Sequence, residues 1–220
     1  MQADGADGPE TALIECPEFR QRLLAFDGAA DERRDDERDE VLYVLAGNGT
    51  LTVAGESHEL EPGTGAFFAR GTAWRVADAG DLRVLSVLIN DPLPATTSHA
   101  VIAAGVRGKA TAGREFTLLA HPDEGCESVT QFVGEIPPGR APNHFHRYDE
   151  VVYVLGGEGA FHADGDTAEL RAGSCVHLPA RLVHCVENTG AGELRVLGVF
   201  RPAGSPAEAY YPDGTAAVVT

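Results

Sequence analysis

Hydrophobic residues in this chain are grouped in short runs that end at glycine, proline or aspartate. The runs Val41–Leu45 and Val151–Leu155 each hold β-branched residues around a tyrosine and lead into a glycine turn. The segments Thr50–Glu56 and Ala160–Asp166 alternate between apolar and polar residues and end in tight turns. Short runs of this kind are typical of strands, and many of them joined by turns favour an antiparallel barrel or sandwich.

The pattern occurs twice. Subtracting 110 from each position places Glu150 on Glu40 and keeps the two halves in register, without a gap, for more than sixty residues. The frame then shifts by two residues in a turn, after which Leu194–Phe200 matches Leu82–Ile89. An insertion in a turn between intact strands is expected of a duplicated β-domain. The sequence therefore predicts an internal duplication of one all-β unit.

A linker separates the two copies. The segment Asn90–Ala100 carries two prolines and several small polar residues, which are typical of a connection. We expect an N-terminal domain at 1–98 and a C-terminal domain at 99–220. The tail from Arg201 onward is expected to pack as an irregular strap or to stay partly mobile.

Composition and charge narrow the possible partners. The 220 residues are 43% hydrophobic, as in a packed globular protein, with 26 glycines and 13 prolines that suit frequent turns. A net charge of −17 argues against nucleic acid or an anionic membrane as a partner, since like charges repel. No run approaches the ~20 apolar residues that span a bilayer. With no signal-like start and four cysteines without a C-x-x-C pair, we expect a cytoplasmic protein with reduced thiols.

The second copy carries a set of candidate metal ligands. His144 and His146 are two residues apart, so on an extended strand both imidazoles leave the same face. Glu150 has the same parity, and His184 follows after a predicted hairpin and strand. Three neutral imidazoles and one carboxylate that converge inside a barrel would suit a divalent first-row transition metal.

Two motifs in the second copy resemble those of the cupin family. The stretch from His144 to Gly157 reads H-x-H, three residues, E, six residues, G, and the stretch from Gly173 to Asn188 reads G, five residues, P, then H, three residues, N. Arg181 departs from the family, which usually has glycine there, and this departure puts the local turn conformation in question.

The resemblance covers both halves, so the chain is similar to the bicupins. It implies two tandem double-stranded β-helix barrels of the jelly-roll type, with a metal in the C-terminal barrel held by His144, His146, Glu150 and His184. Iron, manganese, nickel or zinc would fit this ligand set. The alternative is a decayed barrel that keeps the histidines as core polar residues, at about 1–3 kcal/mol for each polar atom left unpaired.

The first copy lacks these ligands. The three histidines fall on Arg34, Asp36 and Trp74, and only Glu40 keeps its identity. Arginine does not deprotonate to bind a metal, and the indole offers no lone pair. We expect an arginine–carboxylate pair, Arg34 with Glu40 or Asp36, and an aromatic plug in place of the ion. Most of 31–39 reads equally well as a solvated charged loop. This half would have a structural or dimerising role, or would hold a second pocket for a different ligand.

Other side chains are weaker candidates. Arg140 lies four residues before His144 and could bind a substrate carboxylate, or it could be a turn residue that faces water. His162 and His177 could move protons but read as ordinary strand-face residues. Tyr153 has a tyrosine counterpart in the first copy, which favours a packing role.

Two classes of function follow for a small-molecule ligand. The first is a metal-dependent enzyme, with Glu150 as ligand and proton acceptor. Resemblance to cupin dioxygenases suggests an oxidoreductase, whereas a Lewis-acid site would give an isomerase, lyase or hydrolase. The second class is a metal-bearing sugar or metabolite binder without turnover. A storage-type structural role is remote. A homodimer is compatible with either class.

Overall fold

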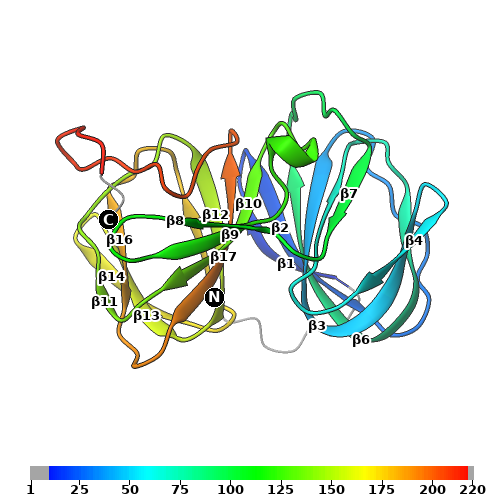
Figure 1. Ribbon diagram of the computed structural model, residues 1–220, viewed down its shortest axis with the longest axis horizontal. Helices are drawn as coiled ribbons and strands as arrows, with labels where there is room; N and C mark the ends of the chain where they lie inside the picture. The colour runs from blue at the N-terminus through cyan, green and yellow to red at the C-terminus, as the bar shows by residue number, and fades with distance from the viewer. Residues whose placement is uncertain (1–9, 218–220) are drawn as a thin grey trace. The chain divides into compact units, whose positions relative to one another are not determined.

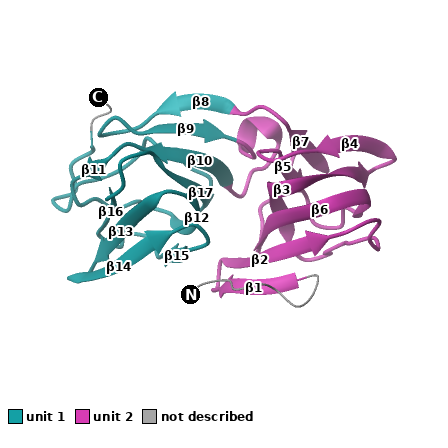
Figure 2. Ribbon diagram, turned by 90° about the horizontal axis from the view of Figure 1, so that it is seen from below, with its two compact units in different colours: residues 1–2, 106–118, 130–220 teal, residues 3–105, 119–129 magenta. Residues whose placement is uncertain are grey.

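The computed structural model describes residues 10–217 and divides the chain into two compact units. Among the described residues, the N-terminal unit comprises 10–105 together with 119–129, and the C-terminal unit comprises 106–118 and 130–217 (Figures 1 and 2). Both are antiparallel β-structures of the jelly-roll type, as predicted. No helix among the described residues is long and apolar enough to span a membrane.

The N-terminal unit is built on one seven-stranded sheet with the order β1-β2-β6-β3-β5-β7, and β4 pairs with β3. The strands β3 and β6 are long and bend, so each contributes to both faces of the barrel. A single 3-10 turn, Pro122–Glu124, also belongs to this unit. The strand bounds are β1 Glu10–Glu15, β2 Phe19–Phe26, β3 Asp39–Val53, β4 Glu56–Leu60, β5 Gly65–Phe68, β6 Trp74–Ile89 and β7 His99–Ile102.

The C-terminal unit has a six-stranded sheet with the order β15-β12-β17-β10-β9-β8 and a four-stranded sheet with the order β11-β16-β13-β14. The strand bounds are β8 Val106–Lys109, β9 Glu115–Leu118, β10 Thr130–Ile136, β11 Gly139–Arg140, β12 Asp149–Gly156, β13 Glu158–Ala163, β14 Asp166–Arg171, β15 Cys175–Leu178, β16 His184–Asn188 and β17 Leu194–Arg201.

Strand pairing confirms the duplication. Glu40 in β3 lies opposite Leu88 of β6, and Glu150 in β12 lies opposite Phe200 of β17. The second pair is displaced from the first by 110 residues on one strand and 112 on the other, which is the two-residue shift seen in the sequence. The two units therefore share one pairing scheme as well as one hydrophobic pattern.

The glycine turns that the pattern indicated are required by the backbone. Gly47 has a φ of +74° and Gly157 a φ of +91°, a region that favours glycine. A Cβ on Gly47 would lie 2.3 Å from the carbonyl oxygen of Asp81, and one on Gly157 would lie 2.6 Å from that of Glu193. Close backbone packing within β3 and directly after β12 thus excludes any side chain at these two positions.

The division between the units differs from the expected boundary at residue 98. Strand β7 follows that position, and it pairs with β5, with Phe68 opposite His99. This strand completes the edge of the N-terminal sheet, and the chain returns to the same unit at 119–129. The predicted linker thus ends inside a strand. Its prolines and small residues marked the irregular segment but gave no sign that pairing resumes at His99.

Candidate functional site

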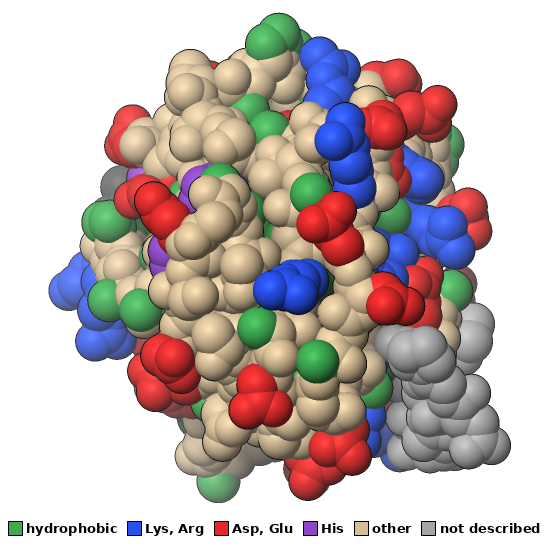
Figure 3. Space-filling model, turned by 90° about the vertical axis from the view of Figure 1, so that its right-hand side faces the viewer, with side chains coloured by type: hydrophobic (Ala, Val, Ile, Leu, Met, Phe, Trp, Pro, Cys, Tyr) green, Lys and Arg blue, Asp and Glu red, His purple; other side chains and the backbone are tan. Residues whose placement is uncertain are grey.

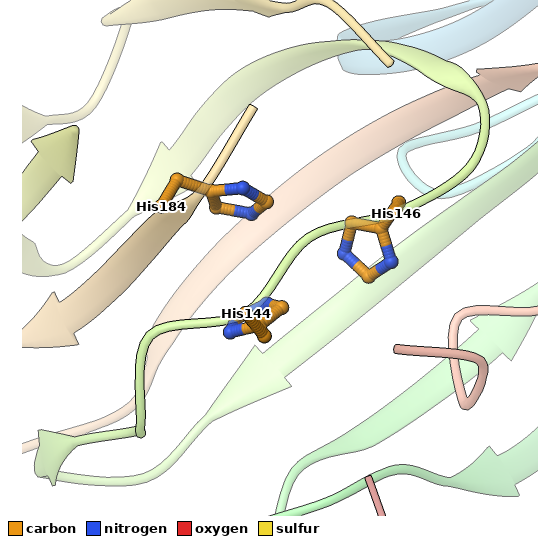
Figure 4. A group of neighbouring side chains, drawn as sticks. All are labelled: His144, His146 and His184. Carbon is orange, nitrogen blue, oxygen red and sulfur yellow. The ribbon is translucent and has the colours of Figure 1, made fainter. Parts of the chain in front are cut away.

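The three histidines of the second copy come together in the C-terminal unit. His144 and His146 lie in the segment between β11 and β12, and His184 is the first residue of β16 (Figure 4). The backbones of His144 and His184 form an isolated antiparallel bridge, with N–H to carbonyl distances of 2.9 and 2.8 Å. This bridge fixes two of the three rings on facing segments, so their geometry is set by the backbone.

Ring geometry brings the three imidazoles around one point. The ring centroids of His144 and His184 are 4.6 Å apart, those of His144 and His146 are 5.2 Å apart, and those of His146 and His184 are 5.4 Å apart. One ring nitrogen from each residue lies within 4.8 Å of the corresponding nitrogen of the others. Figure 4 shows the three side chains directed into a shared space.

Backbone carbonyls orient each ring. The Nδ1 atoms of His144, His146 and His184 lie 2.9, 2.8 and 2.9 Å from the carbonyl oxygens of Pro142, Glu208 and Leu182 respectively. A carbonyl oxygen only accepts hydrogen bonds, so a neutral ring placed this way donates its proton from Nδ1. The lone pair of each imidazole is then on Nε2. This is the arrangement by which outer groups commonly prepare a histidine to bind a metal.

Burial keeps these rings uncharged. Removal from water lowers the pKa of His146 to about 4 and that of His184 to about 3, and it also lowers the pKa of His144. Neighbouring rings lower the pKa of His146 and His184 further, and the charge of the Arg114 guanidinium lowers the pKa of all three histidines. At neutral pH the cluster therefore presents three neutral imidazoles, the form that binds a divalent ion.

Glu150 is buried in the same cavity but is not part of the tight histidine cluster. Burial raises the pKa of its carboxyl to about 8, and the charge of Arg114 opposes that rise only partly. Over residues 10–217 the structure gives this carboxyl no hydrogen-bond donor. A carboxyl in this condition either stays protonated or takes a cation as its partner.

The cavity around these groups is narrow and mainly apolar. It has a volume of about 90 Å³. Its walls include Phe116, Phe132, Phe161 and Phe200, and its polar groups besides the histidines and Glu150 include Arg114. The guanidinium of Arg114 donates through Nη2 to the carbonyl oxygen of Val186 at 2.7 Å, and burial lowers its pKa.

The C-terminal tail covers the site as an irregular strap. Its backbone pairs with the histidine segment through Phe145 and Tyr210, with N–H to carbonyl distances of 2.8 and 3.0 Å. The Tyr148 hydroxyl donates to the carbonyl oxygens of Ser205 and Glu208, and Glu208 also orients His146. The expectation of an irregular strap is confirmed as far as residue 217.

Comparison with known proteins places the chain in a family. The sequence model of the cupin domain matches residues 25–88 and again 132–200, together more than half of the chain. The chain belongs to the cupin family. Because both halves match, it is a bicupin, as the two motifs suggested.

Relatives of known description share parts of the sequence or the fold. The oxalate-binding protein of Thermotoga maritima is 36% identical over 68 residues, which are 30% of this chain and 56% of that relative. This bicupin thus matches only about half of the length of that curated relative. A structure of Bacillus subtilis oxalate decarboxylase, described for its Mn(II) centres, has a TM-score of 0.69 at 15% identity and covers 89% of this chain and 73% of its own.

A third comparison supports the same fold. A cupin 2 conserved barrel domain protein from Leptotrichia buccalis has a TM-score of 0.63 at 16% identity, and the alignment covers 91% of this chain and 92% of that one. At such identities the two solved structures show a shared cupin fold and no more.

The N-terminal cupin barrel fills the equivalent position with protein atoms. Trp74 is 2% exposed and stacks on Phe68, and its Nε1 donates to Glu40 at 3.2 Å. The expected aromatic plug is therefore present. Arg34, however, pairs with Asp36 at the surface, at 2.6 Å. The guanidinium that reaches Glu40 belongs to Arg22 of β2, at 2.9 Å.

Sequence reasoning missed Arg22 because the search for a cation covered only the positions equivalent to metal ligands. Arg22 lies on a different strand, β2, where it shares the parity of the core residues Leu24 and Phe26. An arginine with a buried side chain in an alternating strand was the available signal.

Arg140 does not line the histidine cavity. It is exposed on β11 and borders shallow surface depressions instead. Arg114, which does line the cavity, has no counterpart in the first copy and lies in the turn before β9. The internal repeat therefore gives no signal for Arg114.

The remaining candidates lie on strand faces outside the cavity. His162 bonds to Thr167 and Glu187 at 3.0 and 2.8 Å, and His177 lies 3.8 Å from Asp149. Tyr153 is likewise absent from the cavity wall. Their positions therefore fit the interpretation of these residues as ordinary strand-face side chains.

Proposed function

We propose that the C-terminal cupin barrel binds a divalent transition metal through His144, His146 and His184, with Glu150 as the fourth ligand, and that the protein is a metal-dependent enzyme acting on a small carboxylate. The observation that supports this most directly is the set of three Nδ1–carbonyl contacts. Nothing in an ordinary core requires three buried imidazoles to turn their lone pairs toward one point, whereas a metal does.

The donor set suits iron, manganese, nickel or zinc. Imidazole and carboxylate are common ligands of these ions, and a four-ligand site leaves positions open for substrate or water. Such an ion, when bound, would polarise a substrate oxygen or support redox chemistry. It would also supply the positive charge that the buried carboxyl of Glu150 lacks, and metal binding would lower the pKa of that group.

Arg114 and the size of the cavity suggest the substrate class. A dry protein cavity of about 150 Å³ holds benzene, so a volume of about 90 Å³ suits a ligand of only a few heavy atoms. Arg114 has no carboxylate partner within salt-bridge distance among the described residues, and its guanidinium is well shaped to bind one. The apolar walls would exclude water from the remainder of the ligand. The printed names of the oxalate-binding relative and of oxalate decarboxylase agree with this class.

Glu150 is the group placed to move a proton. It lines the same cavity as Arg114 and the histidines, so a ligand held by Arg114 would lie beside it. A carboxyl whose pKa is raised toward neutrality can give a proton as well as take one. We therefore assign Glu150 a role in proton transfer in addition to metal binding.

The test begins with elemental analysis of the purified protein and continues with assays of the metal-loaded enzyme. A panel of small mono- and dicarboxylates is screened for oxygen uptake and for carbon dioxide release. Oxygen uptake would support the dioxygenase-like reaction, and product formation without it would support a lyase or isomerase. Arg114→Met is expected to raise KM strongly, while Arg140→Met, on the surface, leaves KM unchanged.

A second candidate function is metal-dependent binding without turnover. It is favoured by the relative named as an oxalate-binding protein and by the strap that covers the site. Saturable binding of a small carboxylate by the metal-loaded protein, with no change of the ligand over long incubation, would select it over the enzyme. Absence of both metal and ligand binding would refute the whole proposal.

A further inference from the structure

A second histidine cluster lies in the N-terminal barrel, separate from His144, His146 and His184. His58 and Glu56 are on β4 and His99 begins β7. One nitrogen from each histidine and one carboxylate oxygen of Glu56 lie within 4.8 Å of one another. Sequence reasoning assigned no role to these histidines, which are 41 residues apart and meet only because β7 joins this sheet.

Strand parity places the cluster on the inner face of the barrel. His58 is two residues from Leu60, which is buried in the core, and His99 is two residues from Val101, which packs against the same core. Successive side chains of a strand point to opposite faces, so both histidines face inward with these neighbours. Glu56 shares the parity of His58 but is exposed.

The cluster is within reach of solvent. The side chains of His58 and His99 are 29% and 16% exposed. Histidine surface is visible next to acidic side chains on the face drawn in Figure 3. Because the rings are partly exposed, a small side-chain movement would bring the buried Nε2 of His58 within reach of an ion.

The distances suit a shared ion better than hydrogen bonds. Nε2 of His58 lies 3.6 Å and Nε2 of His99 lies 4.0 Å from the same oxygen, Oε2 of Glu56. Both separations are too long for hydrogen bonds. Two ligands about 2.1 Å from a tetrahedral zinc ion lie roughly 3.4 Å apart, so a small side-chain movement would suffice.

One ring nitrogen of the cluster has no hydrogen-bond partner among the described residues. Nε2 of His58 is buried, and no residue of the described chain hydrogen-bonds to it. Nδ1 of His99 lies 3.0 Å from the Ser98 hydroxyl, which can hold this ring with Nδ1 protonated and the Nε2 lone pair directed at Glu56. A buried imidazole nitrogen without a partner is a cost that a bound ion would remove.

We propose that Glu56, His58 and His99 form a second metal site, which binds Zn²⁺ or a similar borderline divalent ion. Two imidazoles and one carboxylate leave a coordination position for water or an external ligand. The ion would join β4 to β7, two strands that do not pair with each other. The N-terminal barrel would then have lost the central metal position to Trp74 and acquired a peripheral one.

The experiment is a titration of chelator-treated full-length protein with Zn²⁺ alone, followed by calorimetry. The wild type is expected to bind one equivalent of Zn²⁺ at this site. His58→Ala and His99→Ala should each weaken Zn²⁺ binding there by more than about tenfold, since each variant removes one of three donors. Zn²⁺ should also raise the Tm, and this rise should shrink in both variants. Glu56→Gln should also weaken Zn²⁺ binding. Its matched control is Glu59→Gln, because Glu59 is an exposed glutamate on the opposite face of β4.

The central histidines are separated from this test by the variant His144→Ala/His184→Ala. That variant should still bind Zn²⁺ at the Glu56–His58–His99 site, so the result does not depend on the proposed function. Zinc stoichiometry and affinity that stay unchanged in His58→Ala and in His99→Ala would overturn the inference, as would failure of the central-site variant to bind any Zn²⁺.

Discussion

Glu40 and Glu150 occupy the same position in the two barrels and have opposite surroundings. Glu40 accepts hydrogen bonds from the Arg22 guanidinium, the Ser86 hydroxyl and the Trp74 indole. In the second barrel the positions of those three donors hold Phe132, Gly198 and His184. This assignment follows from pairing, because Arg22 lies opposite Ser86 just as Phe132 lies opposite Gly198.

The comparison shows which half is complete without a ligand. A phenyl ring and a glycine donate nothing to a carboxylate, and His184 directs its proton to Leu182 instead. Gly198 has to be small, because a Cβ there would lie 2.3 Å from the Phe132 ring and 2.9 Å from Glu150 Oε1. The first barrel supplies an internal cation to its glutamate, whereas among the described residues of the second barrel no side chain hydrogen-bonds to Glu150, as the proposed metal site requires.

The largest effect is expected from removing a histidine of the C-terminal barrel. His144→Ala or His184→Ala each removes one imidazole from a four-ligand site, so most of the bound metal should be lost. Metal content after purification from metal-supplemented medium measures this directly. Trp74→Ala, the change at the position equivalent to His184, should leave metal content unchanged. Equal loss from Trp74→Ala would break the contrast between the two barrels.

Breaking the internal ion pair should strongly destabilise the first barrel. Arg22→Met leaves Glu40 buried without its cation, which typically costs about 3–5 kcal/mol in the free energy of unfolding. Arg34→Met is the matched control, since its pair with Asp36 is exposed and should contribute less than about 1 kcal/mol. Denaturant unfolding compares the two. A small effect of Arg22→Met would show that Glu40 is satisfied by Ser86 and Trp74 alone.

Much of this architecture could be predicted from the sequence. The duplication, the strands and the three histidines followed from spacing, because a repeat in register imposes the same pairing on both halves and residues two apart share a strand face. The prediction that Trp74 fills the position of the metal site in the first barrel followed in the same way, from its alignment with His184.

Features that lack a counterpart in the repeat could not be predicted. Arg114 lies in a turn before β9, and Arg22 lies at a position where the other copy holds Phe132, so no spacing rule connects either residue to the site. The meeting of His58 and His99 depends on β7 crossing back to β5, a long-range contact without a local signal. The Glu208 carbonyl that orients His146 belongs to an irregular tail, where hydrophobic periodicity carries no information.

A pH effect should distinguish the two glutamates in metal-free protein. Glu150 has a folded pKa of about 8 and an ordinary value near 4.3 when unfolded. Between these values the folded state keeps a proton that the unfolded chain has lost, so stability falls as pH rises. The buried histidines act in the opposite sense, because their folded pKa values lie below the unfolded value near 6.5, but this contribution is common to wild type and Glu150→Gln.

Comparing wild type with Glu150→Gln between pH 6.5 and 8 therefore isolates Glu150. Metal-free wild type is expected to lose about 2 kcal/mol of stability across this range relative to Glu150→Gln, at about 1.4 kcal/mol per pH unit. Thermal unfolding at several pH values, after chelation, measures this difference. Parallel profiles for the two proteins would mean that Glu150 already has a partner in the metal-free protein.

The smallest effect concerns Arg181, which stands where Gly71 stands in the first barrel. Arg181 has a φ of +68° and Gly71 a φ of +80°, so the turn has kept its left-handed conformation although the residue changed. The Arg181 N–H donates to the carbonyl oxygen of His146 at 2.8 Å, which explains why the conformation is retained. A non-glycine residue in this region is strained, and Arg181→Gly should stabilise the protein by up to about 1 kcal/mol without changing metal content. Gly71→Arg, the reciprocal change, should destabilise it by a similar amount in chemical unfolding. If Arg181→Gly instead lowered metal content, the arginine side chain would have a role at the metal site that its exposed position does not suggest.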